Sequence, residues 1–537
     1  MADKKISQLT PATTPLVGTE VMPIVQSGAT VKTPVSNVIT ASSGYTPEGT
    51  GAVARSVASK LQESVSVKDF GAVGDGVTDD TAAIQAAIDY VSGLGGGVIT
   101  GAPGDSYGVS AASNSSGVDM KSGVILDMTG CEIVALTANS SDYRLFYFTG
   151  VSNCGIVGGS IKGDRLVNTV GTGEQGHCVY IILNCSNITI ENVKIYNAWG
   201  DGIYIGRLCS DISVLNCDIT NNRRNNISIV SASNVRIEGC DISSANGVSP
   251  QTGIDVEPNP GDAASNNLII ANCNVYNNAN NGIAFPAPPP TPLIETAIIT
   301  GCHIYGNTQN GVLASYVKEL SITDCVIRDN GVDGIADSAA LATRLVFSGN
   351  MLSDNAGNGI SGFSSNAIIS NNQIVNSGGW GIKWQYGQHL SISGNYYERA
   401  YNSSIVGNTI KNSQKHGIFI TGTVTSSVTS SRKVTISGNT VAFSGLLTDN
   451  TYSGIYLDTY ANTSVVTGNT VVAGTTGNLP LHAIYAVDAT VYASNNQTDS
   501  GAKSGNSQVN VGGVSMASFL NSPSVLSYTY APRYYLP

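Results

Sequence analysis

Two acidic residues, Asp255 and Glu257, stand two positions apart in the stretch GIDVEPN. The alternating apolar residues around them are typical of a β-strand, where residues i and i+2 point to the same side and lie about 7 Å apart. Two carboxyl groups at that spacing suit acid–base glycoside hydrolysis, which needs one protonated and one ionised carboxyl group. We therefore take Asp255 and Glu257 as a candidate catalytic pair, with Asp201 as a third acidic candidate.

Residues suited to binding a sugar chain lie in the same part of the sequence and in one later cluster. Arginine binds acidic groups, and tyrosine and tryptophan stack on the faces of sugars. The candidate binding residues are Glu174, His177, Tyr204, Arg207, Arg223, Arg224, Trp380 and Tyr386. The last two belong to the stretch 380–402, which holds two of the three tryptophans of the chain.

Two other interpretations of the acidic pair remain open. Carboxylates on a solvated β-sheet are common, and Arg223 or Arg224 would then pair with Asp255 or Glu257 in surface ion pairs of small energy. Together with Asp262, the same carboxylates would suit an oxygen-ligated calcium site. For the catalytic interpretation we expect no metal ion and no other cofactor.

Two further functions use other residues of the same region. A lyase acting on a uronate-containing glycan would need a base such as Tyr204 or His177 and a cation such as Arg223 or Arg207 beside the uronate. A non-catalytic adhesin would need aromatic residues and no acid pair. The aromatic stretch 380–402 fits this function. His177 also fits a plain structural interpretation as a polar residue at the start of a strand.

The elements that position these residues form a repeat. A short apolar run, then a small residue or asparagine, then polar residues closing on Gly-Ile recur along the chain. The small residue of each unit is Cys185, Cys217, Cys240, Cys273, Cys302, Cys325, Asn350, Asn372 or Asn395. A unit of about 22 residues accommodates three short strands and three turns, which predicts a parallel β-helix whose Cys and Asn residues form an internal ladder.

The period of two along a strand predicts which residues of each Gly-Ile strand face outward. The isoleucine and the residue two positions later point inward, and the residue between them points to solvent. The outward column is expected to run through Tyr180, Tyr204, Ser228, Asp255, Ala284, Leu313, Ala336, Ser361 and Lys383. Polar residues two positions before the isoleucine, such as His177 and Asp201, are expected at the start of the strand.

Composition excludes several classes of protein. The chain has 537 residues and a formal net charge of −11, which argues against nucleic acid as its main ligand. We expect no membrane insertion, because no apolar run approaches 18 residues and the start MADKKISQLT has no signal-peptide core. The ten cysteines include no CxxC pair, so we expect buried free thiols and synthesis in a reducing cytosol.

The most specific motif is the stretch 67–99, VKDFGAVGDGVTDDTAAIQAAIDYVSGLGGGVI. Thr78, Asp79 and Asp80 are suited to cap an amphipathic helix, which would close the open end of the solenoid. This stretch resembles the N-terminal capping segment of the pectate-lyase-like β-helix superfamily, which is common in phage tailspikes and polysaccharide-degrading enzymes. The resemblance implies a right-handed β-helix.

The remaining segments complete a tailspike-like organisation. Residues 1–45 resemble the modules that attach phage tail proteins to the virion, and 46–65 are expected to form a helical neck. The β-helix is expected over 66–500, with a cap or trimer-contact segment at 501–537. The resemblance to phage tailspike or tail receptor-binding proteins implies a homotrimer in the virion tail, contacts of 1–45 with tail or baseplate proteins, and binding and cleavage of a host cell-surface polysaccharide.

Overall fold

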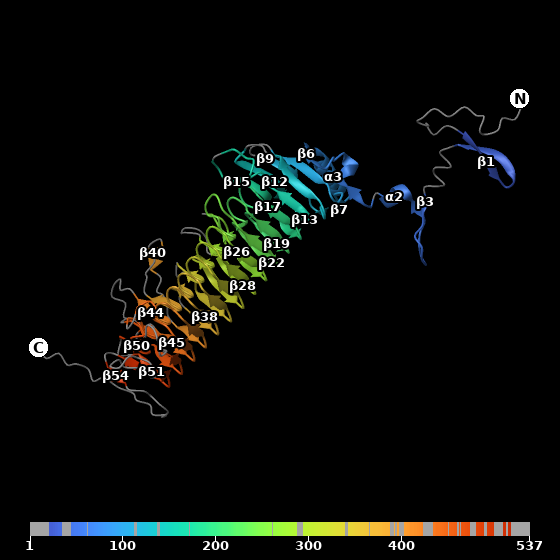
Figure 1. The fold of residues 1–537 in the computed structure, drawn as a ribbon. Helices are drawn as coiled ribbons and strands as arrows, with labels where there is room; N and C mark the ends of the chain where they lie inside the picture. The colour runs from blue at the N-terminus through green and yellow to red at the C-terminus, as the bar shows by residue number, and fades with distance from the viewer. Residues whose placement is uncertain are drawn as a thin grey trace.

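The computed structural model places most of the chain in one elongated stack of β-coils, with the N-terminal segments at one end (Figure 1). The structure describes residues 21–34, 44–61, 63–111, 115–136, 140–170, 172–259, 261–286, 294–338, 342–364, 366–386, 391–392, 395–396, 402–422, 433–448, 451–458, 461, 463–472, 480–487, 491–498, 509–511 and 514–516.

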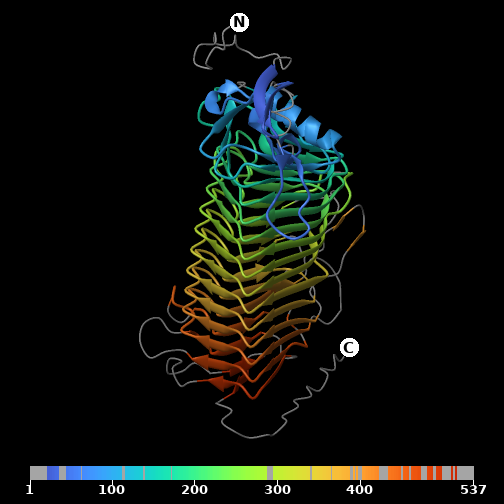
Figure 2. The same cartoon turned by 90° about the vertical axis from the view of Figure 1, so that its right-hand side faces the viewer.

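Three sheets form the walls of the stack (Figure 2), with 16 strands in each. Sheet 1 contains β5 (Val65–Ser66), β7 (Gly97–Thr100), β10 (Val124–Asp127), β13 (Ser152–Val157), β16 (Ser186–Glu191), β19 (Cys209–Leu215), β22 (Ala232–Glu238), β25 (Asn266–Ala271), β28 (Ile294–Thr300), β31 (Val317–Thr323), β34 (Arg344–Ser348), β37 (Ala367–Ser370), β42 (Ser403–Val406), β45 (Val434–Ser437), β48 (Val465–Thr467) and β51 (Tyr492–Ser494). Sheet 2 contains β6 (Asp75–Asp79), β8 (Ser106–Ser110), β11 (Glu132–Leu136), β14 (Ser160–Lys162), β17 (Lys194–Tyr196), β20 (Asp218–Thr220), β23 (Asp241–Ser243), β26 (Asn274–Tyr276), β29 (His303–Tyr305), β32 (Val326–Arg328), β35 (Met351–Ser353), β38 (Gln373–Val375), β43 (Thr409–Lys411), β46 (Thr440–Ala442), β49 (Thr470–Val472) and β52 (Gln497–Thr498). Sheet 3 contains β9 (Ser115–Asp119), β12 (Asp142–Thr149), β15 (Gln175–Ile182), β18 (Ile203–Ile205), β21 (Ile227–Ile229), β24 (Ile254–Val256), β27 (Ile283–Phe285), β30 (Val312–Ala314), β33 (Ile335–Asp337), β36 (Ile360–Gly362), β39 (Ile382–Tyr386), β44 (Ile418–Gly422), β47 (Ile455–Leu457), β50 (Ile484–Ala486), β53 (Val509–Val511) and β54 (Val514–Met516). From β7 onward, successive coils add one parallel strand to each sheet, and sheet 3 ends in β54, which pairs antiparallel with β53.

Inward-facing aliphatic residues at equivalent positions of successive coils build the core. Ile203, Ile227, Ile254 and Ile283 pair in register along sheet 3, and all four side chains are buried. Full burial of one such side chain stabilises the fold by about 1.5–3 kcal/mol. The parallel β-helix predicted from the repeat is confirmed.

An internal ladder runs along the corner between sheets 1 and 2. Its members are Cys217, Cys240, Cys273, Cys302, Cys325, Asn350, Asn372, Asn408, Asn439, Asn469 and Asn496, and all are buried. Nδ2 of Asn372, for example, donates to Oδ1 of Asn408 at 2.9 Å and to the Phe347 carbonyl at 2.8 Å. The predicted inward ladder of Cys and Asn therefore exists.

Two residues assigned to this ladder lie elsewhere. Cys185 immediately precedes β16 and so occupies the corner between sheets 3 and 1, where its thiol donates to the Ile182 carbonyl. Asn395 lies in an antiparallel pair formed by β40 (Ser391–Ile392) and β41 (Asn395–Tyr396), outside the three walls. The ladder position after Asn372 belongs to Asn408, because an excursion between two coils shifts the spacing in the sequence.

The N-terminal cap has the predicted helix, α3 (Thr81–Gly93), preceded by the 3₁₀ helix η2 (Val67–Phe70). Ile84, Ile88 and Val91 are the large side chains that α3 buries against the first coils. The Asp80 carboxylate accepts hydrogen bonds from the backbone N–H groups of Val73 (2.6 Å) and Gly74 (3.2 Å), so this acidic residue fixes the loop before the helix.

The segments before the cap are short. β1 (Val21–Gln26) and β2 (Ala29–Pro34) form a hairpin, and β3 (Gly44–Tyr45) pairs with β4 (Arg55–Ser56). In the described part of 46–65, where a helical neck is expected, the helix is confined to α2 (Val57–Leu61).

Several expectations fall on residues outside the described ranges. These are residues 1–20 and 35–43 of the expected attachment module and, apart from 509–511 and 514–516, the expected cap or trimer-contact segment 501–537. Within the described ranges, none of the helices has the length and apolar character required to cross a membrane.

Candidate functional site

The outward column of sheet 3 follows the predicted register. Tyr180, Tyr204, Ser228 and Asp255 are paired from one coil to the next, and Ala284 follows Asp255. The expectation that this face is solvated is wrong in its middle part, because Ser228 and Asp255 have 0% of their surface exposed. Asn225 Nδ2 donates to both Ser228 Oγ (3.0 Å) and Asp255 Oδ2 (3.2 Å), so turn residues cover the column.

Polar residues two positions before the inward isoleucine form a second ladder at the start of the sheet 3 strands. The Asp201 N–H donates to Nδ1 of His177 (3.1 Å), and the Asn225 N–H donates to Oδ1 of Asp201 (2.9 Å). The Thr252 N–H in turn donates to Oδ1 of Asn225 (2.9 Å). These side chains satisfy backbone donors that the turns would otherwise leave unpaired, which explains why polar residues recur there.

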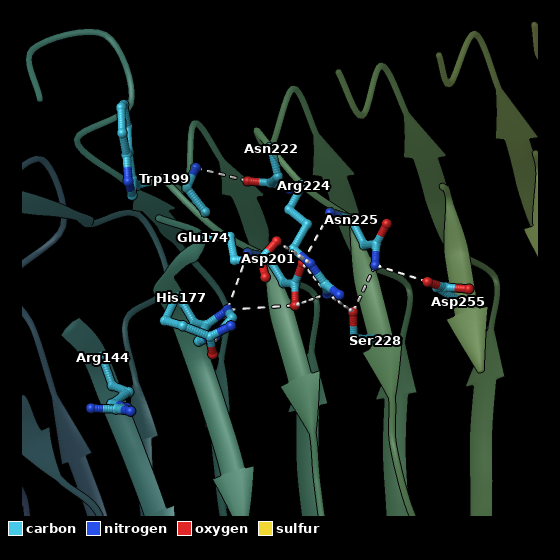
Figure 3. A network of polar contacts seen from close by, with 12 residues as sticks. Arg144, Glu174, His177, Trp199, Asp201, Asn222, Arg224, Asn225, Ser228 and Asp255 are labelled. Carbon is cyan, nitrogen blue, oxygen red and sulfur yellow. Dashed lines mark hydrogen bonds and ion pairs between the residues drawn. The ribbon is translucent and has the colours of Figure 1, made fainter. Parts of the chain in front are cut away.

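Arg224 is the centre of a partly buried charge cluster (Figure 3). Its guanidinium lies 3.1 Å from Oδ2 of Asp201, 2.6 Å from Oε1 of Glu257 and 3.3 Å from Oε2 of Glu174. Burial opposes the charge, but Asp201 and Glu257 outweigh it and raise the pKa of Arg224. One cation therefore faces three carboxyl groups that it contacts directly.

Asp255 is the fourth carboxyl group of this cluster. Its Oδ2 accepts from Asn225, and its Oδ1 has no hydrogen-bond partner among the residues that the structure describes. Burial, followed by the charge of Glu257, raises the pKa of Asp255 well above its usual range. Burial also raises the pKa of Asp201, against the opposing effect of Arg224. Asp255 is thus the group of the cluster best placed to hold a proton.

An aromatic stack adjoins the cluster. The Tyr180 ring lies 4.7 Å from the Tyr204 ring, and the His177 ring lies 5.3 and 5.2 Å from these two rings. Burial lowers the pKa of His177 to about 3, so the ring is neutral, and its Nδ1 already accepts the Asp201 N–H. Burial also raises the pKa of Tyr204. His177 is buried, and neither residue has the pKa of a base that is ready to act at neutral pH.

The other predicted residues are divided between separate places. Arg207 pairs with Asp262 (Nε to Oδ1, 2.5 Å), and Arg223 stacks over Trp199 with its guanidinium 4.0 Å from the ring centroid. Of the two neighbouring arginines, Arg224 is therefore the one that joins the acids. The pairing of Asp262 with Arg207 weakens the calcium interpretation, and the described residues contain no group of three or more metal-ligating side chains.

Trp380 lies farther along sheet 3, at the turn before β39. The side chain of Tyr386 is outside what the structure describes. Sequence reasoning missed Asn225 and Ser228 as parts of the acidic cluster. The repeat does place both residues beside the acids, because Asn225 occupies the same position in its coil as Asp201 and Ser228 the same position as Asp255. The hydrogen bonds between coils that connect them are seen only in the structure.

The chain belongs to the right-handed β-helix family. The family described as "Right handed beta helix region" matches residues 107–287 and 294–515, well over half of the sequence. Residues 64–118, which include the capping helix, match the family described as rhamnogalacturonase A/epimerase, pectate lyase-like. The predicted class and its handedness are confirmed.

Two curated relatives match parts of the chain. The uncharacterized protein YclG of Bacillus subtilis is 30% identical over 217 residues, which cover 35% of this chain and 37% of that protein. The mannuronan C5-epimerase AlgE4 of Azotobacter vinelandii is 36% identical over 148 residues, which cover 25% of this chain and 26% of the epimerase. The chain thus spans well under half the length of these relatives.

Two solved structures share the fold over most of the chain. The A-module of the A. vinelandii mannuronan C-5 epimerase AlgE6 has a TM-score of 0.52 at 20% identity, covering 81% of this chain and 99% of that module. A double mutant of the tailspike protein of E. coli bacteriophage HK620 has a TM-score of 0.52 at 16% identity, covering 88% of this chain and 82% of the tailspike. At these identities the likeness shows the fold alone.

Proposed function

We propose that this protein is a phage tailspike that binds a host cell-surface polysaccharide along sheet 3 and cleaves its glycosidic bonds. The observation that carries the proposal is the pairing of Asp255, a buried carboxyl group with a raised pKa and one oxygen without a partner in the described structure, with Glu257, which Arg224 holds in an ion pair. The β-helix that this chain shares with a tailspike supports the proposal at the level of fold.

In the proposed reaction Asp255 is the general acid. Its proton passes to the glycosidic oxygen as the bond from that oxygen to the anomeric carbon breaks. The Glu257 carboxylate either takes a proton from the water that attacks the anomeric carbon or attacks that carbon itself, with water completing the reaction afterwards. Because Asp255 has no exposed surface, the sugar must displace the side chains of Arg224 and Asn225 that cover the column.

A second candidate is chemistry at the C5 carbon of a uronate, as a lyase or an epimerase. It is favoured by the local sequence similarity to a mannuronan C5-epimerase and by the position of Arg224 among carboxyl groups, where it could bind a uronate. The buried, neutral His177 and the raised pKa of Tyr204 count against these two residues as the base of a lyase.

One experiment separates these reactions. The purified protein is incubated in D₂O with polymannuronate and, separately, with surface polysaccharides extracted from candidate host strains. Hydrolysis gives new reducing ends, elimination adds the ultraviolet absorbance of an unsaturated uronate, and epimerisation places deuterium at C5 without cleavage. Binding without any of these products would identify a non-catalytic adhesin and would contradict the proposed hydrolysis.

Variants test the roles of the two acids. Asp255→Asn and Glu257→Gln should each lower turnover about a hundredfold or more, the usual size of acid–base catalysis, because an amide cannot exchange the proton. Asp218→Asn is the matched control, since Asp218 is an exposed acid paired with Lys194 on sheet 2. Turnover within a few-fold of wild type in both active-site variants would show that the acids form a structural ion-pair network instead.

The tailspike proposal also includes assembly and location. We place the protein in the virion tail as a homotrimer, attached to tail or baseplate proteins through residues 1–45. A long β-helix presents flat faces that parallel neighbours could bury. Light scattering on the purified chain should give three times the mass of 55.4 kDa, and a stable monomer at micromolar concentration would contradict the trimer.

A further inference from the structure

A second set of outward rings lies near the far end of sheet 3. Phe419 pairs with Tyr456, and Tyr456 pairs with Tyr485, on successive strands β44, β47 and β50. Their ring centroids are 5.5 and 5.3 Å apart, and Trp380 stacks on Phe419 at 5.4 Å with an interplanar angle of 17°. We call Trp380, Phe419, Tyr456 and Tyr485 the aromatic row. All four are partly exposed.

Two lysines give the row a positive charge. Lys383 Nζ lies 4.8 Å and Lys415 Nζ 4.2 Å from the centroid of the Trp380 ring. Neither lysine forms an ion pair with a carboxylate in the described part of the chain. This differs from Arg224, whose charge is already shared between three acids.

Buried histidines hold the rings in place. The His416 ring lies 5.0 Å from Phe419 and 4.7 Å from Tyr456, and the His482 ring lies 4.9 Å from Tyr485. Burial lowers the pKa of His416 to about 4, so this residue is neutral, and its Nδ1 accepts the Ser453 N–H at 2.8 Å. The row is therefore a preorganised surface, which reduces the entropy lost when a ligand binds.

We propose that the aromatic row is a second carbohydrate site, which anchors an anionic polysaccharide away from the acid cluster. The rings stack on sugar faces, and Lys383 and Lys415 bind the carboxylates of the glycan. Five steps between paired strands separate Asp255 from Lys383, which at about 4.8 Å a step places the two sites about 24 Å apart along sheet 3. The inference deepens the proposed function, but binding here does not depend on cleavage.

Tryptophan fluorescence gives a direct readout of this site. Trp199 and Trp384 have 6% and 0% of their surface exposed, so Trp380 is the partly exposed one of the three tryptophans. The full-length protein is titrated with polymannuronate and polygalacturonate as anionic probes and with dextran as a neutral probe. We expect a saturable emission shift and protection from acrylamide quenching with at least one anionic polymer, weakened by salt, and none with dextran.

Matched variants locate the binding. Tyr456→Ala and Lys415→Gln should each lower the affinity for the anionic polymer about tenfold, which is the effect of removing a moderate binding hot spot. Tyr305→Ala, in the ring stack with Tyr276 on sheet 2, and Lys411→Gln, an exposed lysine on β43, are the controls and should leave affinity unchanged. The variant Asp255→Asn should lower turnover about a hundredfold or more but leave the fluorescence response intact.

The outcomes separate this inference from the proposed function. A protein without turnover on any polymer, but with a fluorescence response lost in Tyr456→Ala, retains the second site and loses the proposed hydrolysis. Absence of a saturable response to both anionic polymers overturns the second site. An equal response to dextran, or equal affinity in Tyr456→Ala and Tyr305→Ala, overturns it as well.

Discussion

Replacing Asp255 by asparagine should change how stability depends on pH. In the unfolded chain an aspartate ionises near pH 3.9, whereas burial keeps Asp255 protonated in the folded protein to a much higher pH. Above about pH 4 the unfolded state therefore releases a proton that the folded state retains. The stability contributed by this group is fully present below the unfolded pKa and is lost as pH rises through the folded pKa.

The size of the effect follows from proton linkage. Each pH unit over which Asp255 stays protonated in the folded state lowers the free energy of unfolding by about 1.4 kcal/mol. The variant Asp255→Asn has no proton to release, and its amide can still accept the hydrogen bond that Asn225 donates. Its stability relative to wild type should rise by about 1.4 kcal/mol per unit from about pH 4 upward.

Urea denaturation of both proteins at several pH values, followed by circular dichroism, measures this difference. Asp201, whose pKa is also raised, is present in both proteins, so its contribution largely cancels. The variant Asp218→Asn should show a flat difference, because Asp218 is 43% exposed and its ion pair with Lys194 is screened by solvent. A flat difference for Asp255→Asn too would mean that Asp255 is ionised in the folded protein, and would refute its role as an acid.

Three further predictions concern the cluster and the ladder. Arg224→Met should lower the free energy of unfolding by about 3–5 kcal/mol, because it leaves the buried Asp201 without its cation. The control Arg236→Met removes a surface ion pair with Glu238 and should lower the free energy of unfolding by less than about 1 kcal/mol in the same urea assay. Asn372→Ala should lower the free energy of unfolding by at least about 1–3 kcal/mol, because it leaves the buried Phe347 carbonyl without its hydrogen-bond donor. Asn372→Cys should lower it by less, since earlier coils place Cys in the same ladder. Thermal unfolding of the two variants measures the difference. A thiol reagent should label the native protein slowly, because all ten cysteines are buried, and rapid labelling of most of them would contradict the ladder.

Much of the fold could be predicted because the repeat records it directly. The Gly-Ile strands gave the correct outward column of sheet 3, and the Cys and Asn residues gave most of the axial ladder. The errors at Cys185 and Asn395 have one cause. A small residue before a strand occurs at more than one corner of a coil, and spacing in the sequence does not distinguish the corners when excursions intervene.

The four carboxyl groups of the cluster and Arg224 were named from the sequence, but which of the other candidates lie beside them was not predictable. Alternation placed Asp255 on the outer side of the strand, but it could not show that Asn225 and Arg224 from the turns cover that side. Arg224 lies among the acids, whereas Arg223 lies over Trp199. The sequence could not separate the two arginines, because their adjacent positions in a turn do not show where each side chain points. Burial, which determines the protonation of Asp255, arises from several coils together.

The interchange of Cys and Asn along the ladder implies that the protein can change length in whole units. A coil joins its neighbours through the same wall contacts whichever residue it places at the axis, so insertions or deletions of single coils between Asp255 and Lys383 would leave both sites intact. Each added coil would increase their separation by about 4.8 Å. Under the proposed function, the number of coils between the two sites would set the distance between the two sugar units that one glycan chain presents to them.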